Sequence, residues 1–112
     1  MYTSIENVRP CDVDPYGIMH HSIYLQMYEN AVFGYLRDTL NIKDQYPVIR
    51  SADIKYVKSA YMGDVLEVST ELKETSADGK TLLFKQKIQN GKILINRGVI
   101  SVELNRIKGG NV

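Results

Sequence analysis

The sequence predicts an α+β domain in which one curved antiparallel sheet of about five strands wraps around a single long helix. Two patterns carry this prediction. Residues 22–40 place apolar side chains at helical spacing on most sides of one segment. The remaining chain alternates apolar and polar residues between turn signals, which is typical of half-buried strands. A helix with so narrow a polar face has to be covered by other elements, and antiparallel strands can cover it.

The first elements follow in order. Residues 2–9 alternate loosely and predict a strand that ends at Pro10, and a loop over residues 10–21 follows. The helix over residues 22–40 has about 19 residues and a length of roughly 28 Å. One of its faces carries Tyr24, Met27, Tyr28, Ala31 and Tyr35. Because one sheet covers only part of such a helix and leaves its edge strands open, we expect pairing with a second copy.

Four strands are predicted after the helix, over residues 48–57, 65–74, 81–89 and 92–106. Asp78-Gly79 indicates a hairpin after the second of these strands, and Asn90-Gly91 indicates a type I′ hairpin after the third. Gly98 lies within the last strand and predicts a bulge or a sharp bend there. We expect the tail over residues 108–112 to fray.

Composition limits the function classes. The 112 residues fit one domain over 1–112, with 44% hydrophobic and 24% charged residues and a net charge of +1, so no overall field draws the chain to nucleic acid or to a membrane. The single cysteine, Cys11, excludes an intrachain disulfide, and we expect a buried thiol. Without a signal peptide or an apolar run of about 18 residues, we expect a cytoplasmic protein.

The charges are unevenly distributed. Residues 1–47 hold three Lys/Arg against six Asp/Glu, whereas residues 48–112 hold eleven against seven. The basic second half could bind phosphates or an acidic carrier protein, but a solvated strand face is the simpler interpretation. Lys55, Lys58 and Arg50 are the candidates for contacts with phosphates.

The segment from Cys11 to His21 carries the candidate chemistry. It places Asp12, Asp14, His20 and His21 within eleven residues, directly before the helix. The start of a helix has unpaired backbone N–H groups and a partial positive charge, so it attracts anions and developing oxyanions. A carboxylate beside such donors can attack a polarised carbonyl.

The same segment could also bind a metal, since Asp12, Asp14, His20 and His21 are possible ligands. However, the side chains of adjacent histidines diverge, and no ligand spacing supports a site, so we expect neither a metal nor a cofactor.

Two stretches resemble a known family. The first is Asp12-x-Asp14-Pro15-x-Gly17-Ile18-x-x-His21-x-x-Tyr24, which leads directly into the helix. It resembles the hot-dog fold thioesterases of the 4-hydroxybenzoyl-CoA thioesterase/YbgC type. The second, less specific stretch runs over residues 54–64, and the resemblance extends from about Ser4 to Ile107.

The resemblance implies a hot-dog fold that forms dimers, or dimers of dimers, with the active site at the dimer interface. It also implies an acyl- or aroyl-CoA thioester as substrate. The catalytic carboxylate of the family maps onto Asp14, and the backbone N–H that polarises the thioester carbonyl maps onto His21.

Each candidate residue has a structural alternative. Asp14 could serve as nucleophile or general base, or it could only cap a turn. Gly17 permits a tight turn and a close approach of substrate. Tyr24 could border the acyl pocket or belong to the core, Lys58 could meet the phosphates of CoA, and His20 is expected to form a pocket wall. Asp12 is expected to be structural.

The sequence therefore predicts an enzyme, an acyl-CoA or aroyl-CoA thioesterase that acts without a cofactor, a membrane or nucleic acid. An acyl carrier protein thioester is a close alternative substrate. A non-catalytic acyl-CoA-binding sensor or scaffold on the same fold is the alternative from another class. A hydratase of the hot-dog superfamily would require a different arrangement of His and acid.

Overall fold

The computed structural model describes residues 1–107, which form five strands and one α-helix. In chain order the elements are β1 (Tyr2–Asn7), the 3-10 turn η1 (Pro10–Asp12), α1 (His21–Asp38), β2 (Gln45–Tyr56), β3 (Val65–Thr75), β4 (Thr81–Asn90) and β5 (Ile93–Arg106). The predicted α+β class and the helix are confirmed, with α1 at 18 residues. The tail over residues 108–112, which we expected to fray, lies outside the described residues.

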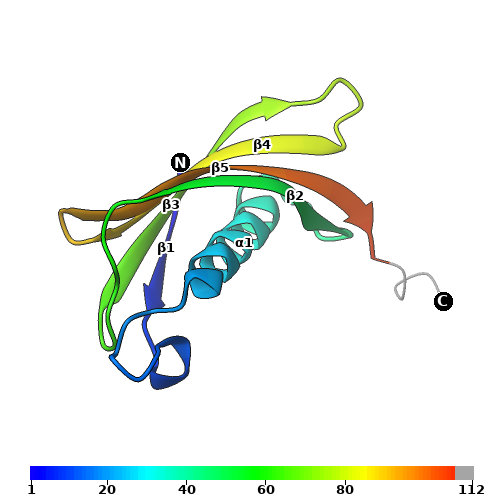
Figure 1. The fold of residues 1–112 in the computed structure, drawn as a ribbon. Coiled ribbons are helices and arrows are strands. Elements are labelled where there is room, and N and C mark those ends of the chain that lie inside the picture. Colours follow the sequence, from blue (N-terminus) through cyan, green and yellow to red (C-terminus); the bar gives the residue numbers. More distant parts are fainter. Residues whose placement is uncertain (108–112) are drawn as a thin grey trace.

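All neighbouring strands are antiparallel, in the order β1-β3-β4-β5-β2. The sheet curves over α1, which lies against its concave face (Figure 1). The strand that follows α1 in the chain, β2, pairs with β5 and not with β3. As a result, β2 is a long edge strand of 12 residues, and the second edge strand, β1, has 6.

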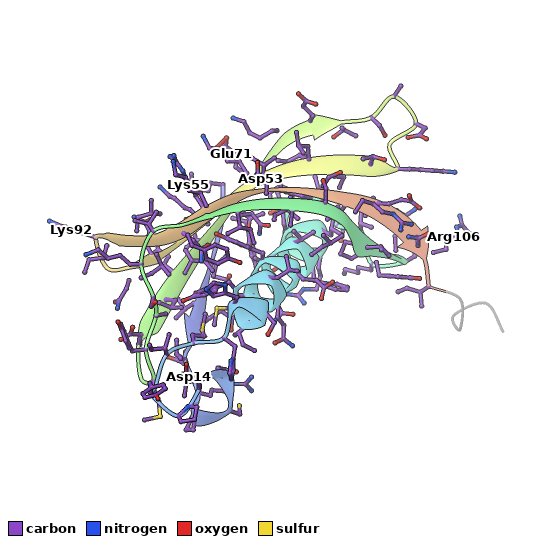
Figure 2. All side chains as sticks on the ribbon, in the orientation of Figure 1. Asp14, Asp53, Lys55, Glu71, Lys92 and Arg106 are labelled. Carbon is purple, nitrogen blue, oxygen red and sulfur yellow. The ribbon has the colours of Figure 1, made fainter. Side chains whose placement is uncertain are left out.

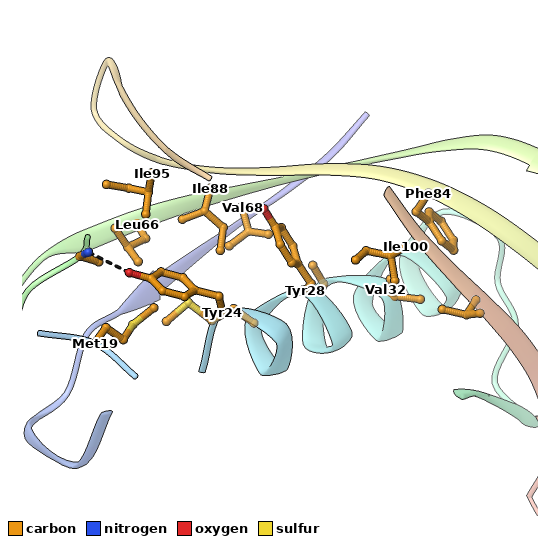
Figure 3. Close-up of a cluster of buried hydrophobic side chains, with 14 of the residues drawn as sticks. Met19, Tyr24, Tyr28, Val32, Leu66, Val68, Phe84, Ile88, Ile95 and Ile100 are labelled. Atoms are coloured by element: carbon orange, nitrogen blue, oxygen red, sulfur yellow. Dashed lines mark hydrogen bonds between the residues drawn. The ribbon is translucent and has the colours of Figure 1, made fainter. Parts of the chain in front are cut away.

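The core forms between α1 and the concave face of the sheet (Figure 3). Tyr24, Tyr28, Val32 and Leu36 recur every four residues along α1 and are fully buried. They pack against alternate residues of the central strands, chiefly Leu66, Val68, Phe84, Ile88, Ile100 and Val102. Burial of each such side chain contributes about 1.5–3 kcal/mol relative to exposure. The opposite side of α1 is only partly covered, and Phe33 is exposed there.

Two details of the sheet differ from the predictions. The register of β5 continues without a shift past Gly98 in both of its pairings, so the predicted bulge at Gly98 is wrong. A side chain at Gly98 would instead approach Ile54 to 3.1 Å, so the glycine makes room for the neighbouring strand. The hairpin after β4 is confirmed, but its type is wrong, because a type I′ turn needs positive φ at two residues and only Gly91 has it.

Within residues 1–107, no helix combines the length and the apolar character needed to cross a membrane.

Candidate active site

The loop before α1 folds back onto the loop that follows β2. The Met62 N–H donates to the Gly17 carbonyl at 3.0 Å, and the Met19 N–H donates to the Ala60 carbonyl at 2.9 Å. An isolated bridge between Ile18 and Tyr61 extends this pairing. Two segments that are about forty residues apart in the chain are thus held together by backbone hydrogen bonds at the end of the molecule where α1 begins.

Asp14 lies in the exposed turn of this loop (Figure 2). Its side-chain Oδ1 accepts the N–H groups of Tyr16 at 2.9 Å and Ile18 at 3.1 Å, and its carbonyl accepts the Gly17 N–H at 2.9 Å. Gly17 has a φ of 79°, which few residues other than glycine adopt without strain. Among residues 1–107, the hydrogen bonds of the carboxylate involve only Oδ1, so Oδ2 is free to meet water or substrate.

Asp12 has a different environment, although it lies only two residues away. Its side chain is buried and forms an ion pair with Arg9, with Nη2 and Oδ1 3.1 Å apart and Nε and Oδ2 3.2 Å apart. The Arg9 backbone N–H also donates to Oδ2 at 2.9 Å. These hydrogen bonds lower the pKa of Asp12 despite its burial. The Asp12 carbonyl accepts the His20 N–H at 3.0 Å, so this residue ties the loop to the start of α1.

The N-terminus of α1 is open. His20 is its N-cap residue and supplies no side-chain cap to the first-turn N–H groups within residues 1–107. The exposed His21 ring stacks on Tyr56 of β2, with ring centroids 4.3 Å apart and an interplanar angle of 9°. Lys58 is exposed two residues beyond Tyr56. The uncapped backbone N–H groups at the start of α1 therefore lie beside an aromatic surface formed by His21 and Tyr56.

Tyr24 is the third member of the aromatic cluster that His21 and Tyr56 form, and its side chain is buried in the core. Its ring lies 5.8 Å from Tyr56 and 6.1 Å from His21. Its hydroxyl accepts the Ala60 N–H at 2.9 Å (Figure 3), and burial raises the pKa of Tyr24. Tyr24 thus anchors the loop after β2 as well as supporting the site. No pattern in the sequence marks Tyr56, because its role depends on a contact between distant segments.

A groove runs from this cluster along α1. Near the site it has a volume of about 370 Å³ between α1 and β2, and it is lined by His21, Ser22, Leu25, Ala52, Ile54 and Tyr56. It adjoins a larger hollow of about 820 Å³ that shares Ser22 and Leu25 and reaches Phe33. The groove follows the free edge of β2 for much of the helix.

Two residues of the segment lie elsewhere than predicted. Cys11 is exposed, because it belongs to η1 and not to a strand end, so the predicted buried thiol is wrong. His20 is exposed and lines none of the hollows described above. Within residues 1–107, no three His, Cys, Asp or Glu side chains come together as metal ligands could.

Comparisons with known proteins agree with this architecture. The sequence profile of the Thioesterase-like superfamily matches residues 8–103. The chain is 31% identical over 99 residues to the acyl-CoA thioesterase YbgC of Haemophilus influenzae, covering 81% of this chain and 71% of that protein. It is 32% identical over 98 residues to the acyl-CoA thioester hydrolase YbgC of Escherichia coli, covering 81% and 72%.

The fold agrees with a solved structure as well. A probable thioesterase from Bartonella henselae superposes with a TM-score of 0.83 at 22% identity, over 94% of this chain and 90% of that chain. The chain therefore belongs to the Thioesterase-like superfamily and is a thioester hydrolase of the YbgC hot-dog type.

Proposed function

We propose that this chain hydrolyses acyl-CoA thioesters, with Asp14 as nucleophile or general base and the backbone N–H of His21 as oxyanion donor. The observation that carries the proposal is that Asp14, with one carboxylate oxygen outside the hydrogen bonds of its turn, lies in the short loop directly before the uncapped N-terminus of α1. The names of the YbgC relatives support the thioester substrate.

The chemistry needs few groups. In the general-base route, Asp14 takes a proton from water while the water oxygen bonds to the thioester carbonyl carbon. The carbonyl oxygen becomes an oxyanion, which the His21 N–H and the partial positive charge of the helix end stabilise. Collapse of this intermediate breaks the C–S bond and releases CoA thiolate and the free acid. In the nucleophilic route, Asp14 attacks the carbonyl carbon, the C–S bond breaks and CoA thiolate leaves, and water then hydrolyses the resulting anhydride to the free acid and the Asp14 carboxylate.

The surrounding residues suit the binding of such a substrate. Gly17 leaves open space above the turn, since a side chain added there would meet nothing within 4 Å. Tyr24 supports the aromatic wall formed by His21 and Tyr56, against which an acyl or aroyl group can pack. We assign Lys58 to the phosphates of CoA, because it is exposed beside this wall.

We further propose that two copies pair along β2 and complete the site as a dimer. The long free edge of β2 offers unpaired backbone groups, and the groove between β2 and α1 leaves apolar surface such as Phe33 uncovered. A second copy would cover both features. Sedimentation equilibrium should give a dimer or tetramer, and a concentration-independent monomer would contradict this part of the proposal.

The decisive experiment measures thiol release from short-chain, long-chain and aromatic acyl-CoAs by the wild-type protein and by Asp14→Asn. Asparagine keeps an Oδ1 acceptor for the Tyr16 and Ile18 N–H groups, so the turn persists while the negative charge is lost. Asp44→Asn, the same change at an exposed position beyond the other end of α1, is the matched control. Full activity in Asp14→Asn would show that Asp14 is not the catalytic carboxylate.

The same panel tests the alternatives. If the wild-type protein binds acyl-CoA but releases no thiol from any member, the sensor or scaffold function is correct. If it hydrolyses acyl groups only when they are carried on acyl carrier protein, the carrier-protein thioesterase is correct.

A further inference from the structure

The outer, convex face of the sheet carries a straight row of basic residues. Lys55 on β2 lies directly opposite Arg97 on β5, and Arg97 lies directly opposite Lys87 on β4. The three side chains point away from α1, because the residues on either side of Lys87 and Arg97 are buried, and Tyr56 beside Lys55 stacks on His21 of α1. Neighbouring strands lie about 4.8 Å apart, so three positive charges follow one another across about 10 Å of sheet.

These charges are not neutralised by the ion pairs of residues 1–107. Those pairs are Arg9–Asp12, Arg37–Asp38, Arg50–Glu103 and Lys73–Glu71. Like charges directly opposite one another destabilise a sheet. A row of three is therefore unfavourable for folding alone, which suggests that an anionic ligand offsets the repulsion.

The surface beside the row is hollowed and contains a fourth base. One hollow of about 360 Å³ is lined by Lys85, Lys87, Arg97, Glu71 and residues around them, and an adjoining one of about 350 Å³ is lined by Asp53, Lys55, Lys85, Arg97, Gly98 and Val99. Figure 2 shows Lys55, Asp53 and Glu71 together on this face. Glu71 forms its ion pair with Lys73 at 2.8 Å and lies opposite Lys85 in the register, whereas Asp53 lies opposite Val99, so the two acids flank the row and neither lies opposite one of its three members.

We propose that this row binds the phosphates of the nucleotide end of CoA, an inference that rests on the proposed thioesterase function. Lys55 directly precedes Tyr56, whose ring faces the His21 side of the same strand. A substrate arm that leaves the site past Lys58 therefore reaches the outer face within a few residues of β2. The 3′-phosphate and the diphosphate of CoA are separate anionic groups, and Arg97 between two lysines can bind one of them in a bidentate manner.

The experiment compares Lys87→Gln/Arg97→Gln with Lys92→Gln/Arg106→Gln. Both double variants remove one lysine and one arginine, but Lys92 lies in the turn just before β5 and Arg106 at the far end of β5, away from the row (Figure 2). We expect the row variant to raise the KM for acyl-CoA about tenfold or more, with little change in kcat. The KM for the matching acyl-pantetheine, which lacks every phosphate, should stay unchanged. The row variant should also unfold at a higher temperature, because a repulsion is removed.

Calorimetric titration with 3′,5′-ADP tests the site independently of activity. Wild type and control variant should bind this nucleotide, and the row variant should bind it about tenfold more weakly. Equal changes in both double variants, an altered KM for acyl-pantetheine, or equally tight binding of inorganic pyrophosphate would each overturn the assignment to the nucleotide. A wild-type protein that binds 3′,5′-ADP through the row yet hydrolyses no thioester would refute the proposed function and leave the phosphate site standing.

Discussion

The two halves of the loop before α1 use the same residue type in opposite ways. In the inner half, Asp12 is 3% exposed and accepts hydrogen bonds on both oxygens from Arg9. In the outer half, Asp14 is only half-buried and uses a single oxygen, in a turn that Gly17 permits. A carboxylate whose oxygens are both paired within the loop fixes its shape, whereas one with a free oxygen can also meet a substrate. The comparison separates a structural aspartate from a candidate catalytic one.

The largest effect that tests this comparison is the loss of activity in Asp14→Asn. We expect kcat to fall by about 10²–10⁴-fold, the usual contribution of a positioned base, because the asparagine amide cannot take a proton. The free energy of unfolding should change by less than about 0.5 kcal/mol, since the Oδ1 acceptor remains. Single-turnover kinetics and urea denaturation measure the two quantities on the same preparations. If the free energy of unfolding fell as much as the activation free energy rose, Asp14 would be a structural residue like Asp12.

Asp12→Ala should show the reverse pattern. It removes the charge-assisted hydrogen bonds from Arg9 and should destabilise the fold by about 1–2 kcal/mol, near the low end for such bonds because the Arg9 side chain is 66% exposed and screened by solvent. The kcat of the fraction that remains folded should stay within a few-fold of wild type. Urea denaturation gives the stability. A kcat reduced as strongly as in Asp14→Asn would mean that Asp12 shares the chemistry.

Tyr24→Phe tests the support beneath the outer half. The substitution keeps the buried ring but leaves the Ala60 N–H without its acceptor, which should cost about 1–2 kcal/mol. The loss should appear first as faster hydrogen exchange at Ala60 and Met62, because Met62 donates to Gly17 in the paired loop. Tyr28→Phe is a useful comparison, since its hydroxyl bonds Asn96 in the core, away from the loops. Equal exchange at Ala60 in both variants would contradict the anchoring role of Tyr24.

Much of this fold follows from periodicity in the sequence. The helix and the four strands after it were predicted within a few residues, because the helical spacing in 22–40 and the alternation in the strands repeat over many positions. Local patterns do not encode which strands pair, so the edge position of β2 and the contact of Tyr56 with His21 could not be predicted. The bulge predicted at Gly98 was wrong for a similar reason. In the sequence, a glycine that makes room for the side chain of a neighbouring strand, here Ile54, looks the same as a glycine that forms a bulge.

The site was predictable to a smaller degree. The resemblance alone singles out Asp14 and His21, and their catalytic roles stay predictions. What distinguishes Asp12 from Asp14 is the position of Arg9, which composition and spacing alone do not fix. Of the basic row on the outer face, the sequence singled out Lys55 alone, because only the strand register shows that Arg97 and Lys87 lie beside it.

Gly17→Ala should have a smaller effect than the changes above. A φ of 79° costs a residue with a side chain about 1 kcal/mol, and no clash adds to this cost because the space around Gly17 is open. Gly79→Ala has a similar φ of 74° in the hairpin after β3 and is the matched control. Both variants should lose similar stability in urea, but only Gly17→Ala should raise the KM for acyl-CoA. An equal KM in both variants would show that the turn does not contact substrate.

The smallest expected effect is the change in the free energy of unfolding as the pH falls. The Arg9 hydrogen bonds hold the pKa of Asp12 below its usual range, so the unfolded chain takes up a proton at higher pH than the native one. The stability that this pair contributes is therefore complete above the unfolded pKa of about 3.9 and is lost as the pH falls through the lower, native value. Urea denaturation of wild type and Arg9→Gln between about pH 6 and pH 2.5 should show curves that converge toward acid. Parallel curves over this range would show that the ion pair is not what holds the inner half of the loop.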